Sequence, residues 1–297
     1  GEIVGVLVAQ ESNVSISLHQ RRLEIITGIA QQVSLAIQND RASQETVQRE
    51  RLEQEIMLAR QIQKTFLPSS LPELEGWDIE IQWETAREVG GDFYDVFKIG
   101  KDQLGIVIAD VSDKGMPAAL YMTVTRTLIR AFIQTTSSPG RLLERVNRLL
   151  VVDSQDGLFV TAVYAILNLI DGTLTYSIAG HTLPLQVQAS DRNVHRLEKG
   201  GMPLGVLSTT HYPDRQIQLD DGDMLIFYTD GITESFSPEG EPFGEDRLIQ
   251  AITSTSSSNL TTLKEKINQT LREFRQGAPP SDDLTTVLVQ RKPLLAD

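Results

Sequence analysis

Four short acidic motifs hold the residue types in this sequence that are best suited to chemistry. They are Gly90-Gly91-Asp92-Phe93-Tyr94-Asp95, Asp110-Val111-Ser112-Asp113-Lys114-Gly115, Thr229-Asp230-Gly231 and Ser281-Asp282-Asp283-Leu284-Thr285. Each lies at one end of a predicted apolar strand, so its carboxylates would emerge from a rigid element. Mg²⁺ and Mn²⁺ are hard ions that prefer oxygen ligands, and one carboxylate can bridge two of them. The motifs therefore predict an acidic metal site.

A pair of such ions would supply hydrolytic chemistry without a protein nucleophile. Two ions about 3.5–4 Å apart lower the pKa of a bridging water, which can then attack phosphorus in line. The chain has no cysteine, which excludes disulfides, thiolate metal sites and a cysteine-nucleophile phosphatase. We therefore expect a metal-activated water and no catalytic side chain.

Asp-Gly and Asp-Asp are also common turn dipeptides, so each motif taken alone could be an ordinary turn. Four motifs that each adjoin an apolar strand, spread over one domain, are hard to assign to chance. Asp95 and Asp113 are left open as either groups that support the ligands or turn caps. The remaining loop aspartates are interpreted as turn formers, namely Asp102, Asp171, Asp220 and Asp221.

Composition limits the classes of partner. The 297 residues are 40% hydrophobic and carry a net charge of −13, which disfavours nucleic acid and anionic membrane surfaces as partners. The longest apolar runs fall far short of the roughly 20 residues of a membrane helix, and no signal peptide is visible. We expect a cytoplasmic protein with no membrane or nucleic-acid partner.

The chain divides into three predicted parts. Residues 1–39 combine a strand-like run with a helical pattern, and they resemble the C-terminal end of a GAF domain whose earlier part is absent. Residues 40–68 are predicted to form a helical coiled-coil linker, and parallel dimerisation is favoured over packing within one chain. The predicted seam consists of Leu52, Ile56, Ala59, Gln63 and Phe66. Residues 69–292 are predicted to form one catalytic domain.

The pattern of this third part predicts an α+β fold, in which an antiparallel β-sandwich is flanked by helices. Strands outnumber helices and do not alternate with them one for one as in a parallel α/β fold. Strands are predicted at 79–85, 92–98, 103–110, 159–168, 173–179, 222–228 and 285–290, and helices at 117–134, 141–153, 245–251 and 261–275.

Seven motifs in order resemble the PPM (PP2C-type) phosphatase family, in the bacterial branch that includes RsbU and SpoIIE. They are ARQIQKTFLP (59–68), VGGDFYDVF (89–97), IADVSDKGMPAALYM (108–122), FVTAVYAIL (159–167), AGHTLPL (179–185), LIFYTDGITE (225–234) and DDLTTVLV (282–289). The resemblance covers about residues 59–290. It implies a β-sandwich that dephosphorylates phosphoserine or phosphothreonine on a STAS-type anti-anti-sigma factor in stress or developmental signalling.

The resemblance also implies a ligand set for two Mn²⁺ or Mg²⁺ ions. Asp92, Asp110, Asp230 and Asp282 match the family's ligands, with the Val111 carbonyl as an auxiliary ligand. Asp282 is preferred to its neighbour Asp283, which stays open as an alternative.

Two further positions bear on phosphate binding. His181 lies in a loop that departs from the family's Ala-Gly-His-Asn-Pro-Pro pattern, and it could contact phosphate or cap a turn. Arg87 is the nearest candidate for the arginine that grips phosphate in eukaryotic relatives.

Other functional classes fit the sequence less well. A catalytically silent, phosphatase-like module that binds a phosphoprotein would not need all four acidic motifs. A calcium-binding module would need an Asp-x-Asp-x-Asp-Gly loop, which is absent. A nucleotide cyclase would need residues that bind a base and a triphosphate, and no P-loop occurs.

Overall fold

The computed structural model of the chain describes residues 6, 8, 16–153, 157–255 and 259–292. The chain forms two compact units, Gly1–Leu58 and Ala59–Asp297, and each is described by itself. Most of the strand-like run at the N-terminus, on which the GAF-like interpretation rests, lies outside the described residues.

One long helix, α1 (Ile16–Phe66), contains most of the first unit and extends into the second. The helical pattern within residues 1–39 forms the first part of this helix, which continues into the predicted linker without a break. Two residues after Phe66 comes Pro68, which cannot continue a helix. Because the boundary between the units falls after Leu58, the predicted linker 40–68 is shared between them. Among the described helices, α1 included, none is both long enough and apolar enough to cross a membrane.

The second unit is built on two five-stranded antiparallel sheets. The first sheet has the order β2-β3-β4-β5-β8, and the second has the order β1-β10-β9-β6-β7. The strands are β1 (Trp77–Glu84), β2 (Phe93–Ile99), β3 (Gln103–Val111), β4 (Val160–Asn168), β5 (Thr173–Ala179), β6 (Leu185–Val187), β7 (Val194–Arg196), β8 (Arg215–Gln218), β9 (Met224–Tyr228) and β10 (Leu284–Arg291). The predicted antiparallel sandwich is confirmed.

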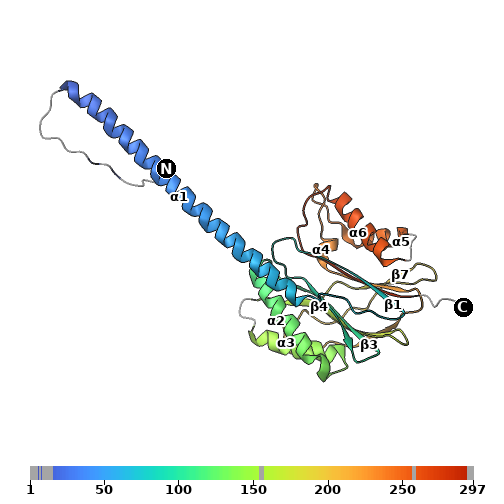
Figure 1. Ribbon diagram of the computed structural model, residues 1–297. Coiled ribbons are helices and arrows are strands. Elements are labelled where there is room, and N and C mark those ends of the chain that lie inside the picture. The colour runs from blue at the N-terminus through green and yellow to red at the C-terminus, as the bar shows by residue number, and fades with distance from the viewer. Residues whose placement is uncertain (1–5, 7, 9–15, 154–156, 256–258, 293–297) are drawn as a thin grey trace. The chain divides into compact units, whose positions relative to one another are not determined.

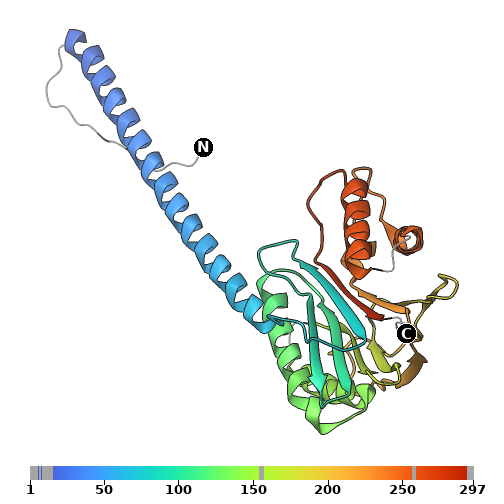
Figure 2. The same cartoon turned by 45° about the vertical axis from the view of Figure 1, so that its right-hand side comes forward.

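Helices cover the outer faces of the sandwich (Figure 1, Figure 2). Helices α2 (Met116–Phe132) and α3 (Pro139–Asp153) lie on the first sheet, with a short 3₁₀ turn, η1 (Ile133–Thr135), between them. Helices α5 (Gly244–Ser254) and α6 (Leu260–Phe274) lie on the second sheet, and α4 (Asp230–Thr233) follows β9 directly. Three apolar clusters result: one under α2 and α3, one between the sheets, and one under α5 and α6.

The elements that sequence patterns missed are short. Strands β6 and β7 have three residues each, β8 has four, and α4 is a single turn of four. Segments of this length do not complete enough of a hydrophobic period to be recognised. They form because longer neighbours offer hydrogen-bonding edges, as β9 does for β6 and β5 does for β8.

Candidate metal centre

Strand alternation places two of the predicted ligands between the sheets. Along β3, Ile106 and Ile108 belong to the apolar cluster between the sheets, whereas Val107 and Ala109 belong to the cluster under α2 and α3. Successive side chains of a strand point to opposite faces, so Asp110 shares the face of Ile108. By the same alternation, Asp92 lies on the inner face that Val96 of β2 also occupies.

Asp92 is the most buried of the four candidate aspartate ligands, with 1% of its surface exposed. Its Oδ2 accepts hydrogen bonds from the Thr229 hydroxyl at 2.7 Å and the Thr285 hydroxyl at 2.6 Å. Thr229 directly follows β9 and Thr285 lies at the start of β10, so both donors come from the side of the second sheet. Asp92 therefore joins the two sheets at the end where the acidic motifs meet.

Asp283 uses both carboxylate oxygens to hold the loop before Asp92. Its Oδ1 accepts from the Ala86 N–H at 2.8 Å, and its Oδ2 accepts from the N–H groups of Gly91 and Asp92 at 2.8 and 3.3 Å. A Cβ at Gly90 would lie 2.1 Å from Asp283 Oδ2. The double glycine therefore lets this backbone approach the carboxylate closely.

The second glycine of that loop brings a backbone carbonyl to the site. A Cβ at Gly91 would lie 2.9 Å from the carbonyl oxygen of Val111, the residue after Asp110. The first two acidic motifs are thus in direct contact, and the Val111 carbonyl lies beside the peptide that leads into Asp92.

Asp230 and Asp282 meet through a third close glycine contact. A Cβ at Gly231 would lie 2.0 Å from the Asp283 carbonyl oxygen and 3.3 Å from the Asp282 Cβ. The Asp282 carboxylate forms an ion pair with Lys114, whose Nζ lies 2.7 Å from Oδ2 and donates to the Ser281 carbonyl at 2.9 Å. Lys114 follows Asp113 in the second motif, so this ion pair joins the second and fourth motifs.

Burial and mutual repulsion raise the pKa values of these carboxyl groups. The pKa of Asp92 is raised well above its ordinary value by burial and then by Asp110 and Asp283. Burial and the charge of Asp230 raise the pKa of Asp110 to about 8. Burial, followed by the charges of Glu234 and Asp282, raises the pKa of Asp230 to about 6. A bound cation would relieve this repulsion.

The oxygen ligands and the negative charge of these residues therefore suit a divalent cation, but most of the carboxylates already bind other groups of the protein. Two threonines hold Asp92, three backbone N–H groups hold Asp283, and Lys114 holds Asp282. In the described parts of the chain, no group of three or more Asp, Glu, His or Cys side chains is arranged so that it could hold an ion as it stands. Metal binding at this site would require these side chains to reorient.

The structure places the other candidate residues around this cluster in different ways. Asp95 is 1% exposed and lies on the opposite face of β2, toward α2. Its two oxygens accept hydrogen bonds from Arg130 at 2.5 Å, and Arg126 Nε lies 3.3 Å away. This contact fixes α2 to β2 and keeps Asp95 apart from the other aspartates. Asp113 is exposed, has φ of 75°, and its Oδ1 accepts from the N–H of Lys114.

His181 is buried, with 7% of its surface exposed. Its Nδ1 lies 2.8 Å from the Thr161 hydroxyl, and Thr161 lies opposite Asp110 in the β3–β4 ladder. Burial lowers the pKa of His181 to about 3, so the imidazole is neutral at physiological pH. A buried, uncharged imidazole is suited to supporting the loop and poorly suited to binding a phosphate dianion.

The sequence did not indicate that Thr229, Thr285, Lys114 and Gln63 contact the acidic site. The first three lie inside the acidic motifs, so the signal was present, but only the fold shows that the threonines face Asp92 and that Lys114 reaches Asp282. Gln63 was assigned to a coiled-coil seam, and the structure instead places its side chain against Gly90.

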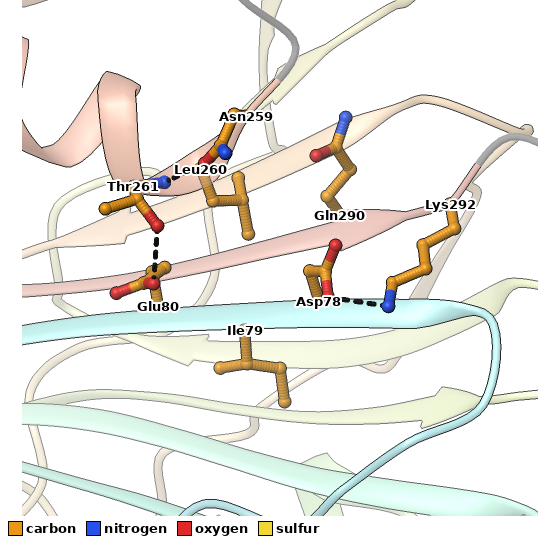
Figure 3. Close-up of a pocket in the computed structure, with 8 residues that line it drawn as sticks. All are labelled: Asp78, Ile79, Glu80, Asn259, Leu260, Thr261, Gln290 and Lys292. Carbon is orange, nitrogen blue, oxygen red and sulfur yellow. Dashed lines mark hydrogen bonds and ion pairs between the residues drawn. The ribbon is translucent and has the colours of Figure 1, made fainter.

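A separate groove of about 410 Å³ lies between β1 and the N-terminal end of α6 (Figure 3). Thr261 donates to Glu80 at 2.8 Å, and Lys292 pairs with Asp78 at 2.9 Å. None of the four acidic motifs contributes to its lining. The groove is therefore distinct from the candidate metal centre.

The family model described as Stage II sporulation protein E (SpoIIE) matches residues 100–292, which include three of the four acidic motifs. The chain belongs to this family. The protein IcfG of Synechocystis is 34% identical over 264 residues, covering 80% of this chain and 41% of IcfG. The phosphoserine phosphatase RsbU of Bacillus subtilis is 30% identical over 241 residues, covering 81% of this chain and 71% of RsbU.

A solved structure supports the same assignment at the level of the fold. The SiaA PP2C domain of Pseudomonas aeruginosa has a TM-score of 0.71 and 21% identity, covering 82% of this chain and 97% of that domain. The resemblance to the RsbU and SpoIIE branch of PP2C-type proteins is confirmed. The GAF-like and coiled-coil assignments for the N-terminal part of this SpoIIE-family chain remain predictions.

Proposed function

We propose that this SpoIIE-family protein is a metal-dependent phosphatase that hydrolyses phosphoserine or phosphothreonine on a regulatory protein. The observation that carries the proposal is the meeting of Asp92, Asp110, Asp230 and Asp282 from both sheets, with pKa values of the first three raised. A scaffold would gain nothing from an arrangement that holds like charges together. RsbU, a relative over four-fifths of this chain, is itself a phosphoserine phosphatase.

These four aspartates and the Val111 carbonyl would hold two Mn²⁺ or Mg²⁺ ions. Asp282 is preferred to Asp283 as a ligand, because one lysine ion pair and one backbone hydrogen bond are easier to exchange for a metal than three backbone hydrogen bonds. When bound, the ions would activate a water for attack on phosphorus. Asp283 and the two threonines would keep the ligand-bearing loops in register.

Two cationic side chains lie where they could meet a phosphoprotein. Lys114 is partly exposed beside Asp282, and an Arg87 Nη1 lies 3.9 Å from where a Cβ at Gly115 would be. Both belong to loops that carry metal-ligand candidates, one before Asp92 and one after Asp110. A metal that displaced Lys114 from Asp282 would free its ammonium group for the substrate phosphate.

The partner proposed for the site is a phosphorylated STAS-type protein, as in partner-switching signalling. We further propose that the first unit mediates homodimerisation through α1. Large apolar side chains of this helix are about half exposed, including Leu23, Ile29, Val33 and Leu52. Leu52→Glu is expected to convert a dimer to a monomer in sedimentation equilibrium, and an unchanged mass would count against the linker as the dimer contact.

The test of the proposed activity is hydrolysis of p-nitrophenyl phosphate and of a phosphoserine peptide with Mn²⁺. Wild type should turn over both, whereas EDTA, Asp110→Asn and Asp230→Asn should each abolish turnover. Asp102→Asn is a matched control, because Asp102 is an exposed aspartate in the turn at the other end of β3. Turnover that survives EDTA or both active-site substitutions would refute the proposal.

One observation favours a second candidate function, that of a silent module that binds a phosphoprotein without turnover. The carboxylates are engaged by threonines, backbone N–H groups and Lys114 rather than converging on an ion site. Calorimetric titration with Mn²⁺ separates the two functions. No Mn²⁺ binding, combined with retained binding of a phosphoserine STAS-type protein, would support the silent module.

A further inference from the structure

The last turns of α1 belong to the catalytic unit and end in a buried polar contact. Gln63 is 3% exposed, although its neighbours Gln61 and Lys64 in the same helix are exposed. Leu67, one turn further on, is buried in the apolar cluster under α2 and α3. The end of the helix is therefore anchored in the core that supports β2 and β3.

The Gln63 carboxamide binds both backbone groups of one residue in the metal-site loop. Its Nε2 donates to the Gly90 carbonyl at 2.6 Å, and its Oε1 accepts from the Gly90 N–H at 3.2 Å. Gly90 is buried and lies outside any strand, so no ladder satisfies these two groups. A buried backbone N–H or C=O that lacks a partner is costly, so the side chain replaces a strand neighbour at this point.

Few other side chains could make this contact. A carboxylate accepts from an N–H but cannot donate to a carbonyl, and an apolar side chain does neither. The two hydrogen bonds thus require the amide of glutamine at this distance from the helix axis. This requirement explains why a polar residue interrupts an otherwise apolar stripe on α1.

The contact leads directly to Asp92. Gly90 is followed by Gly91, whose N–H binds Asp283, and then by Asp92, whose own N–H binds the same carboxylate oxygen. A Cβ at Gly90 would meet Asp283 at 2.1 Å, so the peptide is held between Gln63 on one side and Asp283 on the other. A shift of the helix end would change the position of this peptide, and with it that of Asp92.

We propose that Gln63 is a positioning residue that couples the end of α1 to the metal site through the backbone of Gly90. The inference deepens the proposed function and rests on it for the identity of the metal site. In this scheme the linker helix controls the enzyme through one side chain, because its last turns hold or release the loop that carries Asp92. The expected consequence of losing the contact is weaker metal binding rather than a changed chemical step.

The test compares Gln63→Met with Gln61→Met in the full chain. Both replace a glutamine of α1 by a side chain of similar length with good helix propensity, but only Gln63 contacts the loop. Hydrogen exchange in EDTA reports on the contact, Mn²⁺ calorimetry reports on the coupling, and urea unfolding in EDTA reports on stability.

Gln63→Met should speed exchange of the amides at 90–92 and weaken Mn²⁺ binding about ten-fold, as expected for losing roughly one buried hydrogen-bond pair. The kcat at saturating Mn²⁺ should stay within about two-fold of wild type, and Gln61→Met should behave as wild type throughout. Unchanged exchange at 90–92 would overturn the inference. A loss of stability with unchanged Mn²⁺ affinity would also overturn it, because Gln63 would then be merely structural.

The outcome also separates this inference from the proposed function. If wild type neither bound Mn²⁺ nor hydrolysed phosphate esters, the proposed function would fail, and the coupling to a metal site would fail with it. If wild type were an active Mn²⁺ enzyme and Gln63→Met had wild-type exchange and affinity, only the role of Gln63 would be refuted.

Discussion

The acidic cluster should make the metal-free protein less stable as pH rises, and Asp110→Asn should reverse part of that loss. Asp110 has a pKa of about 8 in the folded chain against an ordinary value of 3.8. Between these values the native carboxyl keeps a proton that the unfolded chain releases. The stability that this protonated carboxyl contributes is therefore fully present below pH 3.8 and is lost as pH rises toward 8. Above pH 8 the stability no longer changes through this group.

The size of the effect follows from the same shift. Each pH unit in that interval lowers the free energy of unfolding by about 1.4 kcal/mol, which gives an upper limit of about 4 kcal/mol at pH 7. Because Asp110 shares the cluster with Asp92 and Asp230, and because side chains can relax, we expect about 2–4 kcal/mol. Asparagine resembles the neutral carboxyl in size and carries no charge at any of these pH values.

The assay is urea unfolding in EDTA at pH 4.5, 6 and 7.5. Asp110→Asn should be nearly as stable as wild type at pH 4.5 and more stable at pH 7.5, while Asp102→Asn should follow wild type at every pH. With Mn²⁺ the order should reverse, because a bound ion stabilises only the protein that retains its ligands. A difference between Asp110→Asn and wild type that does not grow with pH would refute the reasoning.

Three further changes test separate contacts. Asp95→Asn should lower the free energy of unfolding, measured with urea, by about 2–3 kcal/mol, because it leaves the two arginines of α2 without their buried partner. Wild-type stability would contradict a stabilising ion pair between β2 and α2. Lys114→Met should tighten Mn²⁺ binding, measured by calorimetry, up to about five-fold, since it removes a competing cation from Asp282. Weaker binding would show instead that Lys114 supports the site. Gly231→Ala should weaken Mn²⁺ binding at least about ten-fold and lower the free energy of unfolding by about 1–3 kcal/mol, because the alanine Cβ would meet the Asp283 carbonyl. Unchanged Mn²⁺ affinity would place this contact outside the metal site.

The sequence by itself determined the fold class, the strands with a full hydrophobic period, and the four acidic motifs. Periodicity and strand-end position are local properties, so β5 (Thr173–Ala179) was predicted to the residue and Asp110 was recognised at the end of β3. The family motifs were equally local, and the family model matches residues 100–292, which contain five of the seven.

Tertiary structure decided which face each polar residue takes and which distant backbone it meets. Asp92 and Asp95 are three residues apart in one motif, yet alternation sends one between the sheets and the other to the arginines of α2. Asp282 and Asp283 are adjacent, but only the fold gives Asp283 the three backbone donors that tie up its oxygens. Gln63 fitted a coiled-coil seam by spacing, and its partner Gly90 is 27 residues away. Such contacts depend on chain segments that only folding brings together, which is why spacing alone could not predict them.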